Sequence, residues 1–316
     1  MKRFLKNLFI ALLPLLLINA LCFGTLVLLS VGDDLTYVNY ASAFDKEARL
    51  DSLSATSERG IVAVIGGSNT RFGFDSRIME EALGRDAVNM GIHIGLGLDF
   101  MFDQTAPSLR AGDVLVVSAE YNQFTDRVIY DGDIALTDMY LIKRRWGKAF
   151  AHIIDTRNFL SAYKLIRTRI KRRRMKGGGN RIPENMEKRT EYNRYGDFTA
   201  HYGRTPKAEW HTQRCTGDVD PTTVKETADR IAALRERGVR VIILPPTYAE
   251  SYFRSDENAI GNIVRALDEA GIGYVCNPAA VSYHDSLYYD SPYHLTRSGI
   301  DRHMATIMPF LQKALR

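Results

Sequence analysis

The stretch Ile61-Val-Ala-Val-Ile-Gly-Gly-Ser-Asn-Thr70 decides the fold that we predict for this chain. Its first five residues are apolar, and a short uninterrupted apolar run is typical of a strand buried in a parallel sheet. The run ends at Gly66 and Gly67 and presents Ser68 at the carboxyl end of the strand. Because open α/β sheets build their sites at that end, Ser68 is the first candidate functional residue.

Strands and helices alternate on both sides of this stretch. Further strands are predicted at 87–91, 114–118, 239–244 and, in a short form, 273–276. Helices are predicted at 75–83, 96–109, 222–237, 258–270 and 296–315, and Pro309 can bend or shorten the last of them. This alternation indicates the α/β class, with a parallel sheet covered on both faces.

One large domain, residues 60–316, is predicted to hold these elements. Between about 126 and 221 the pattern breaks into aromatic, basic and glycine-rich pieces, including Gly177 to Gly179, and we interpret this segment as an insertion, partly helical and partly loop. The basic run at 167–176 fits either a solvated helix face or a surface that meets lipid headgroups or an acidic polymer.

The N-terminus carries a predicted membrane anchor. Residues 8–31 contain no charged side chain, and about 24 helical residues extend roughly 36 Å, enough to cross a hydrocarbon core. Basic residues precede this run and acidic residues follow it, which predicts a cytoplasmic N-terminus and an extracytoplasmic, periplasmic C-terminal domain. Residues 1–32 are therefore predicted as cytoplasmic tip and anchor, and 33–59 as a polar linker. A cleaved signal peptide is the alternative, but the apolar run is long for one.

Composition limits the partners, metals and cofactors that the chain is expected to bind. The chain has 316 residues, a formal net charge of +5 and three cysteines. Cys215 and Cys276 are expected either to form one disulfide or to remain two buried thiols. Neither zinc spacing nor aromatics interleaved with the basic run are found, so no nucleic-acid partner, metal or cofactor is predicted.

A second candidate segment lies near the C-terminus, in Tyr288-Tyr-Asp-Ser-Pro-Tyr-His-Leu-Thr-Arg-Ser-Gly299. Asp290 precedes His294 by four residues, just ahead of the last predicted helix. A serine hydroxyl is a weak nucleophile that needs a base, and the base needs a carboxylate to fix its tautomer. Ser68, His294 and Asp290 supply the three types. By spacing alone a structural role is the more common one, because Asp and His this close in sequence are mostly surface or helix-cap residues and Ser68 can cap the segment that follows it.

These segments resemble the SGNH/GDSL hydrolase superfamily. Gly67-Ser-Asn-Thr-Arg-Phe-Gly-Phe-Asp75, Asn89-Met-Gly91 and Asp290-Ser-Pro-Tyr-His294 occur in the order of that superfamily. The chain looks most like its membrane-anchored bacterial branch, which includes proteins similar to the D-alanyl-lipoteichoic acid transfer protein and exopolysaccharide O-acetyltransferases. The resemblance implies a flavodoxin-like three-layer α/β/α sandwich with a parallel sheet.

The resemblance also implies residue roles. Ser68 would attack an acyl carbonyl, His294 would take and return the proton, and Asp290 would orient His294. The backbone amides of Ser68 and Gly91 would stabilise the oxyanion.

The third block, Ser118-Ala-Glu-Tyr-Asn-Gln-Phe124, departs from the pattern because the familiar Gly-x-Asn-Asp is missing. Asn122 is the candidate replacement for its oxyanion donor. Asn69, Glu120 and Tyr121 are candidate substrate-binding residues. The spacing of Asp290 to His294 is also one longer than the most familiar spacing.

The function implied is transfer of an acyl group, expected to be acetyl, to a cell-envelope or exported polysaccharide, or its removal, through an acyl-enzyme. A membrane-bound partner would deliver the acyl groups. Two alternatives remain open: a non-catalytic accessory protein that keeps the fold and binds glycan or an assembly partner, and a periplasmic lipase or thioesterase.

Overall fold

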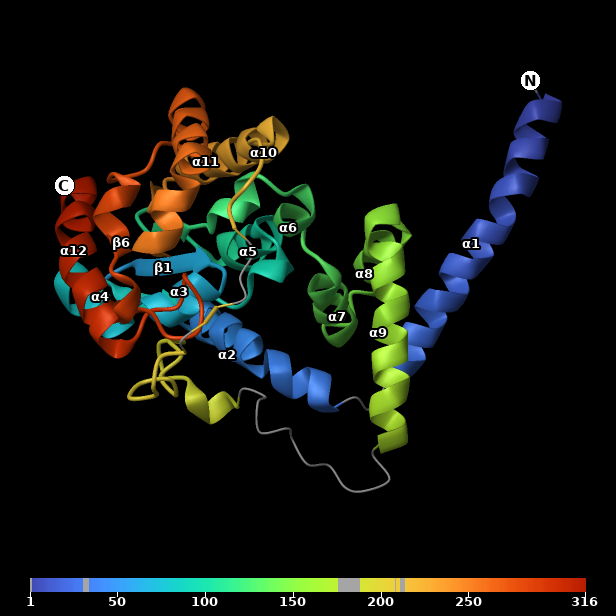
Figure 1. Ribbon diagram of the computed structural model, residues 1–316, viewed down its shortest axis with the longest axis horizontal. Helices are drawn as coiled ribbons and strands as arrows, with labels where there is room; N and C mark the ends of the chain where they lie inside the picture. The colour runs from blue at the N-terminus through green and yellow to red at the C-terminus, as the bar shows by residue number, and fades with distance from the viewer. Residues whose placement is uncertain (1, 31–33, 176–187, 208, 211–213) are drawn as a thin grey trace. The chain divides into compact units, whose positions relative to one another are not determined.

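The computed structural model describes residues 2–30, 34–175, 188–207, 209–210 and 214–316 (Figure 1). Gly177 to Gly179 and the end of the predicted basic run, Lys176, lie outside these residues. The chain forms two compact units. One comprises Met1–Tyr40 and Asp133–Glu187, and the other Ala41–Gly132 and Lys188–Arg316. The predicted insertion thus contributes residues to both units.

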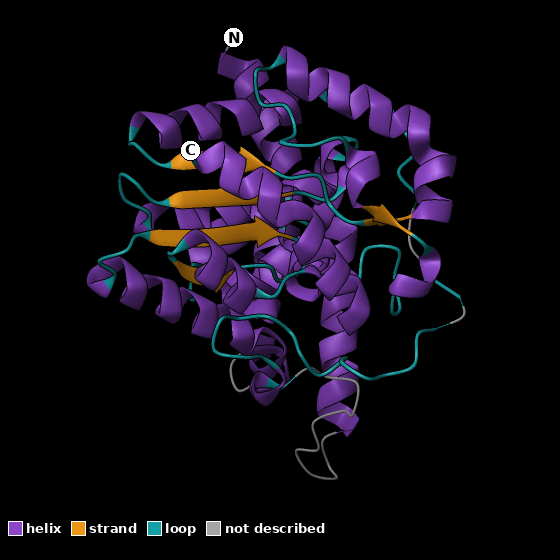
Figure 2. Cartoon of the chain, turned by 90° about the vertical axis from the view of Figure 1, so that its left-hand side faces the viewer, coloured by secondary structure: helices purple, strands orange, loops and turns teal. Residues whose placement is uncertain are grey.

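The second unit is built on a parallel sheet of four strands (Figure 2). The strands are β1 (Ile61–Gly66), β2 (Asp86–Asn89), β3 (Val114–Ser118) and β4 (Arg240–Ile243), in the spatial order β2-β1-β3-β4. Val64 of β1 is in register with Val116 of β3, so both strands end at the same edge. The four longer predicted strands are confirmed within two or three residues.

The short strand predicted at 273–276 is wrong. Val275 donates one backbone hydrogen bond to Ile243 of β4, at 2.8 Å, and the pairing goes no further. Gly271 adopts φ +70°, and Pro278 follows soon after, so the segment between them is too short to extend a ladder. A separate two-stranded sheet joins β5 (Tyr248–Ala249) to β6 (Ser282–Tyr283).

Helices follow the strands as the alternation predicts. The helices that lie wholly in this unit are α3 (Ser68–Gly73), α4 (Ser76–Leu83), α5 (Leu98–Thr105), α6 (Arg127–Asp131), α10 (Pro221–Glu236), α11 (Glu250–Glu269) and α12 (Arg297–Leu315). Helix α4 shows how the sequence sets the boundaries, because the Asp75 side chain caps its first turn and Gly84, with φ +64°, ends it. Helix α11 begins eight residues before the predicted start, and α12 runs through Pro309.

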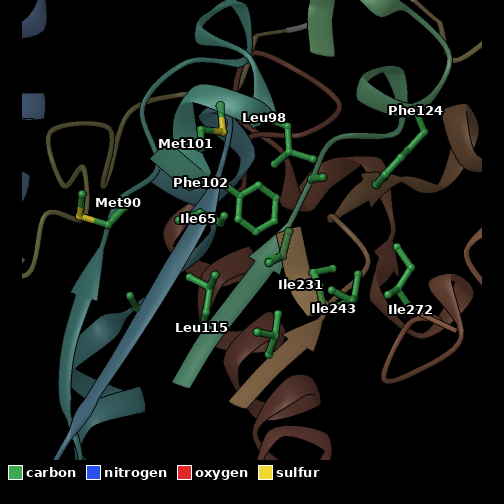
Figure 3. Close-up of a cluster of buried hydrophobic side chains, with 14 of the residues drawn as sticks. Ile65, Met90, Leu98, Met101, Phe102, Leu115, Phe124, Ile231, Ile243 and Ile272 are labelled. Atoms are coloured by element: carbon green, nitrogen blue, oxygen red, sulfur yellow. The ribbon is translucent and has the colours of Figure 1, made fainter. Parts of the chain in front are cut away.

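Successive residues of β1 feed two buried clusters on opposite faces of the sheet. Ile61, Ala63 and Ile65 belong to one cluster, part of which Figure 3 shows, whereas Val62 and Val64 belong to the other. All five side chains are at most 1% exposed. This alternation is that of a strand buried on both sides, so the unit is a mixed α/β fold with a parallel sheet at its centre.

The predicted polar linker is largely helical. Helix α2 covers Asp34–Thr56, and in its second half Lys46 and Leu50 are buried, with Leu50 part of the larger core cluster. The segment reads as polar because these few inward-facing positions are outnumbered by solvated ones. A short apolar stripe was enough to attach the helix to the α/β unit.

The first unit is helical. It contains α1 (Lys2–Ser30), α7 (Ile134–Ile142), α8 (Trp146–Ile154) and α9 (Thr156–Met175), together with the start of α2. Helix α1 is long enough and apolar enough to cross a membrane. The ring of Phe23 meets that of Phe150 at 5.3 Å, and the buried Arg169 of α9 donates to the carbonyl oxygen of Leu26 at 3.3 Å. Part of the predicted insertion therefore packs on α1.

Candidate active site

Ser68 follows the Gly66-Gly67 turn and is the first residue of α3. The turn needs glycine, since a Cβ on Gly66 would lie 2.4 Å from the carbonyl oxygen of Ser118 and one on Gly67 would lie 2.4 Å from Glu120 Oε1. These close approaches bring α3 down onto the end of β3 and leave Ser68 partly exposed at the carboxyl edge of the sheet. This is the placement that the sequence predicts.

The hydroxyl of Ser68 donates a hydrogen bond to Glu120 Oε1 at 3.4 Å, and the backbone N–H of Asn69 donates to the same oxygen at 3.2 Å. Glu120 is 4% exposed, and burial raises its pKa to about 7, against the opposing effect of hydrogen bonds from Asn69 and from the side chain and backbone of Ser68. Glu120 therefore holds the front of α3 and changes charge near neutral pH.

Asp290 and His294 form the pair that the sequence predicts. His294 Nδ1 and Asp290 Oδ1 lie 2.7 Å apart. The turn between them is closed by a hydrogen bond from His294 N–H to the carbonyl oxygen of Ser291, at 3.1 Å. Burial raises the pKa of Asp290, but His294 and the ammonium group of Lys207, 3.5 Å away, outweigh burial and leave this pKa below its usual value. The carboxylate is thus kept charged, as a partner of the ring must be.

Helix α3 brings the ring of His294 to the neighbourhood of Ser68. Phe72, one turn after Ser68 on α3, stacks on His294 with centroids 4.2 Å apart and planes within 11°. Among the hydrogen bonds of the described residues, none joins Ser68 to His294, because the serine hydroxyl is directed to Glu120. The contact between Asp290 and His294 is therefore formed, whereas Ser68 bonds to Glu120 and not to His294.

The predicted oxyanion donors differ in availability. The backbone N–H of Gly91 donates to Asn89 Oδ1 at 2.9 Å, so this amide is already engaged and the prediction for Gly91 is not supported. Its missing Cβ serves close packing instead, since that atom would lie 2.7 Å from the backbone nitrogen of Arg71. The backbone N–H of Ser68 lies in the first turn of α3, where a helix supplies no carbonyl partner, and it interacts with the Glu120 carboxylate instead. Asn122 is 5% exposed, in a 3₁₀ turn after β3.

Two predicted substrate-binding residues have structural roles. The side-chain amide of Asn69 is 2% exposed and donates to the carbonyl oxygen of Ser118 at 2.9 Å, which ties α3 to β3. Tyr121 is fully buried, with its ring 5.5 Å from that of Tyr248. A buried side chain with these neighbours does not face a substrate, so both predictions are corrected. Glu120 stays at the site through its bond to Ser68.

Sequence reasoning missed Phe72, Lys207 and His201. The one-turn spacing of Phe72 from Ser68 could have indicated that its ring lies near the site. Lys207 and His201 come from a distant segment, and nothing in the sequence indicates that they reach the site. His201 is 2% exposed, and burial lowers its pKa to about 4. Because of this burial, His201 is neutral at physiological pH, although its Nε2 donates to the carbonyl oxygen of Leu295 at 3.0 Å, a hydrogen bond that raises the pKa.

A pocket of about 600 Å³ lies beside Asp290, and Lys207 belongs both to its wall and to the ion pair with Asp290. Its aromatic lining comes from Trp210, Tyr252 and Tyr288. The indole N–H of Trp210 is buried and has no hydrogen-bond partner among the described residues. Within the described residues, no group of three or more histidine, cysteine or acidic side chains is arranged to hold a metal ion.

Comparison with known proteins returns no family: no family model matches the chain, and no curated protein matches it. The likeness to the SGNH/GDSL superfamily therefore rests on the residues of the chain itself.

Proposed function

We propose that this protein is a membrane-anchored serine acyltransferase or esterase of SGNH type, acting on a cell-envelope or exported polysaccharide. The observation that carries the proposal is the Asp290–His294 pair stacked on Phe72 of α3, the helix that begins with Ser68. The parallel sheet with cores on both faces is compatible with the three-layer sandwich of that superfamily. Helix α1 would anchor the chain in the membrane, with the second unit, which holds Ser68 and His294, outside the cytoplasm.

In the proposed reaction, substrate binding turns the Ser68 hydroxyl from Glu120 to His294 Nε2. Ser68 Oγ then attacks the acyl carbonyl carbon while its proton passes to His294, and Asp290 stabilises the imidazolium. Collapse of the tetrahedral intermediate gives an acyl-serine, and the proton leaves with the departing alcohol. A sugar hydroxyl then completes transfer, or water completes hydrolysis, and His294 is restored.

The aromatic pocket beside Asp290 supports a sugar acceptor. Aromatic faces with a few polar groups at the rim are the usual lining of a ligand site, and here Lys207 and Asp285 supply polar groups beside the aromatic rings. An acceptor bound there would approach the acid–imidazole pair from the side of Lys207.

A serine-directed fluorophosphonate tests the proposal. The detergent-solubilised full chain is expected to be labelled, and Ser68→Ala and His294→Ala are expected to lose labelling. Ser298→Ala, which removes a hydroxyl of α12 that bonds to Thr296, is the matched control and should label as the wild type does. Labelling that survives Ser68→Ala would contradict the proposal.

A second candidate is favoured by the two engaged groups. The Ser68 hydroxyl is bonded to Glu120 and the Gly91 N–H to Asn89, as in a fold that binds glycan or an assembly partner without chemistry. No labelling of the wild-type chain, together with full polymer acylation in cells that carry only Ser68→Ala, would establish this candidate.

A further inference from the structure

A second pocket, of about 230 Å³, lies in the α/β unit between the second half of α2 and the segment that begins at Lys188. Asp45, Lys46 and Arg49 line it from α2, and Arg189, Tyr192 and Arg194 line it from the other segment. It shares no lining residue with the pocket beside Asp290. The proposed chemistry at Ser68 makes no use of it.

The lining is strongly basic. Four of these side chains are cationic and one is anionic, and Asp45 is already paired with Arg189. The Arg194 side chain is 72% exposed and reaches Glu80 only at 3.7 Å. A net positive charge of this kind, partly enclosed by protein, attracts an anion more strongly than an exposed cluster does.

Arg49 is the most informative of the four. Its guanidinium donates to the carbonyl oxygen of Ala87 at 3.1 Å and lies over the ring of Tyr195, 5.1 Å from the centroid. Among the described residues, no carboxylate lies within ion-pair distance of it. Burial lowers the pKa of Arg49, ahead of the opposing field of Glu80. A half-buried guanidinium without a carboxylate is a binding partner for an external anion.

Two contacts join this pocket to the segment around Ser68. Lys46 Nζ donates to the carbonyl oxygen of Gly91. The phenol oxygen of Tyr192 accepts from Arg71 Nη1 at 3.3 Å, and Arg71 lies three residues after Ser68 on α3. One residue of the pocket wall, Tyr192, is therefore hydrogen-bonded to the helix that begins with the candidate nucleophile.

We propose that this basic pocket binds an acidic sugar residue of a glycan, through its carboxylate or phosphate group. Guanidinium groups pair with both anions in the same forked geometry, and 230 Å³ is below the usual volume of a drug-sized site, which suits a single sugar unit. The glycan would be the polymer acted on at Ser68, a link that rests on the proposed function. Anion binding itself does not.

Binding of defined probes tests this inference on the full chain in nanodiscs of zwitterionic lipid. The probes are trigalacturonate for a carboxylate, a glycerol-phosphate trimer for a phosphate, and maltotriose as the uncharged control. Calorimetry is expected to show at least one acidic probe binding tenfold or more tightly than maltotriose, with an affinity that falls as salt rises. Equal affinity for acidic and uncharged probes would overturn the proposal.

Matched variants locate the binding. Arg49→Gln and Arg194→Gln are each expected to weaken the acidic probe about tenfold or more, as loss of a charge-assisted hydrogen bond does. Arg194 is exposed, so its variant keeps the test informative if Arg49→Gln fails to fold. Arg77→Gln, an exposed arginine of α4 paired with Glu81, is the control and should bind as the wild type. Equal weakening in Arg77→Gln would show that the probe responds only to the general positive charge of the protein, which would overturn the proposed site. Displacement of the probe by anionic phospholipid vesicles, but not by excess unlabelled trimer, would overturn it as well.

The pocket and the proposed chemistry fail separately. Ser68→Ala is expected to bind the acidic probe with unchanged affinity while losing fluorophosphonate labelling. Binding without labelling in the wild type would refute the chemistry alone, and labelling without binding would refute the pocket alone.

Discussion

At the scale of single residues, the proposed reaction depends most on the charge of Asp290. Asp290→Asn keeps the shape of the side chain but offers His294 Nδ1 an amide, so the ring adopts the wrong tautomer. We expect turnover of a chromogenic acetyl ester to fall about 10⁴-fold, the size of effect seen when this carboxylate is neutralised in serine hydrolases.

Asp301→Asn is the control for this prediction, because Asp301 lies on α12 and pairs with Arg297. Steady-state kinetics of both variants would check it. An Asp290→Asn protein with wild-type turnover would mean that the pair with His294 is structural.

Glu120 predicts a dependence of stability on pH. Its pKa in the folded state is raised to about 7, above the ordinary value of 4.5 that holds in the unfolded chain. The folded state therefore binds the extra proton between these values, and the stabilisation is complete below pH 4.5 and lost as pH rises through 7. We expect Glu120 alone to lower the free energy of unfolding by up to about 3 kcal/mol across this window, while the lowered pKa of buried His201 acts in the opposite direction.

Glu120→Gln, which cannot titrate, should remove this contribution, so the stability of the wild type relative to the variant should fall as pH rises. Denaturant unfolding of the solubilised chain at several pH values would measure it. A difference in stability between the wild type and Glu120→Gln that stays constant from pH 5 to pH 7 would contradict the raised pKa.

The residue types of the site were predictable from the sequence, whereas their pairing was only partly so. Asp290 and His294 are close in sequence, so a turn sufficed to bring them together. Ser68 and Glu120 are 52 positions apart, and which of two nearby acceptors the hydroxyl chooses depends on side-chain packing that no spacing records. For the same reason, Gly91 was assigned a free amide that Asn89 in fact occupies.

At the scale of elements, the turn between β1 and α3 sets the position of the site. A Cβ at Gly66 would lie 2.4 Å from the backbone oxygen of Ser118 and 2.1 Å from Thr70 Oγ1. Because a strand backbone cannot give way, Gly66→Ala is expected to lower the free energy of unfolding by about 1–3 kcal/mol and to displace Ser68.

Gly73→Ala, on the same helix, is the matched control, since nothing lies within 4 Å of a Cβ there. Its stability should remain within about 1 kcal/mol of the wild type. Thermal unfolding of both variants, with ester turnover measured in parallel, would test the comparison. Equal stability of the two variants would show that the turn has room to adjust.

Regular elements with strong apolar patterns were the predictable part of the fold. The runs that became β1, β3 and β4 are almost entirely apolar and flanked by turn residues, so their type and order followed directly. Helix α2 and the segment at 273–276 were not predictable in the same way. A helix held by a few inward positions reads as polar, and a four-residue strand gains too few hydrogen bonds for its sequence to decide the outcome.

At the scale of the whole molecule, the charges that flank the apolar run of α1 predict its orientation. A phosphatase that is active only outside the cytoplasm, fused after Arg316, is expected to be active, and a fluorescent protein that folds only inside the cytoplasm should stay dark there. Replacing Lys2, Arg3 and Lys6 with glutamate should reduce this asymmetry. Equal phosphatase activity from a fusion that lacks residues 1–32 would show that α1 is not needed for export.

Cys215 and Cys276 are free thiols in the folded α/β unit, and burial raises the pKa of the first to about 12 and of the second to about 11. Neither thiolate forms while the fold is intact, so the mature protein should be insensitive to oxidant and to reductant alike. The nascent chain has no such protection. If it crosses into an oxidising compartment, the yield of folded protein depends on whether folding buries these two thiols before disulfide-forming enzymes oxidise them.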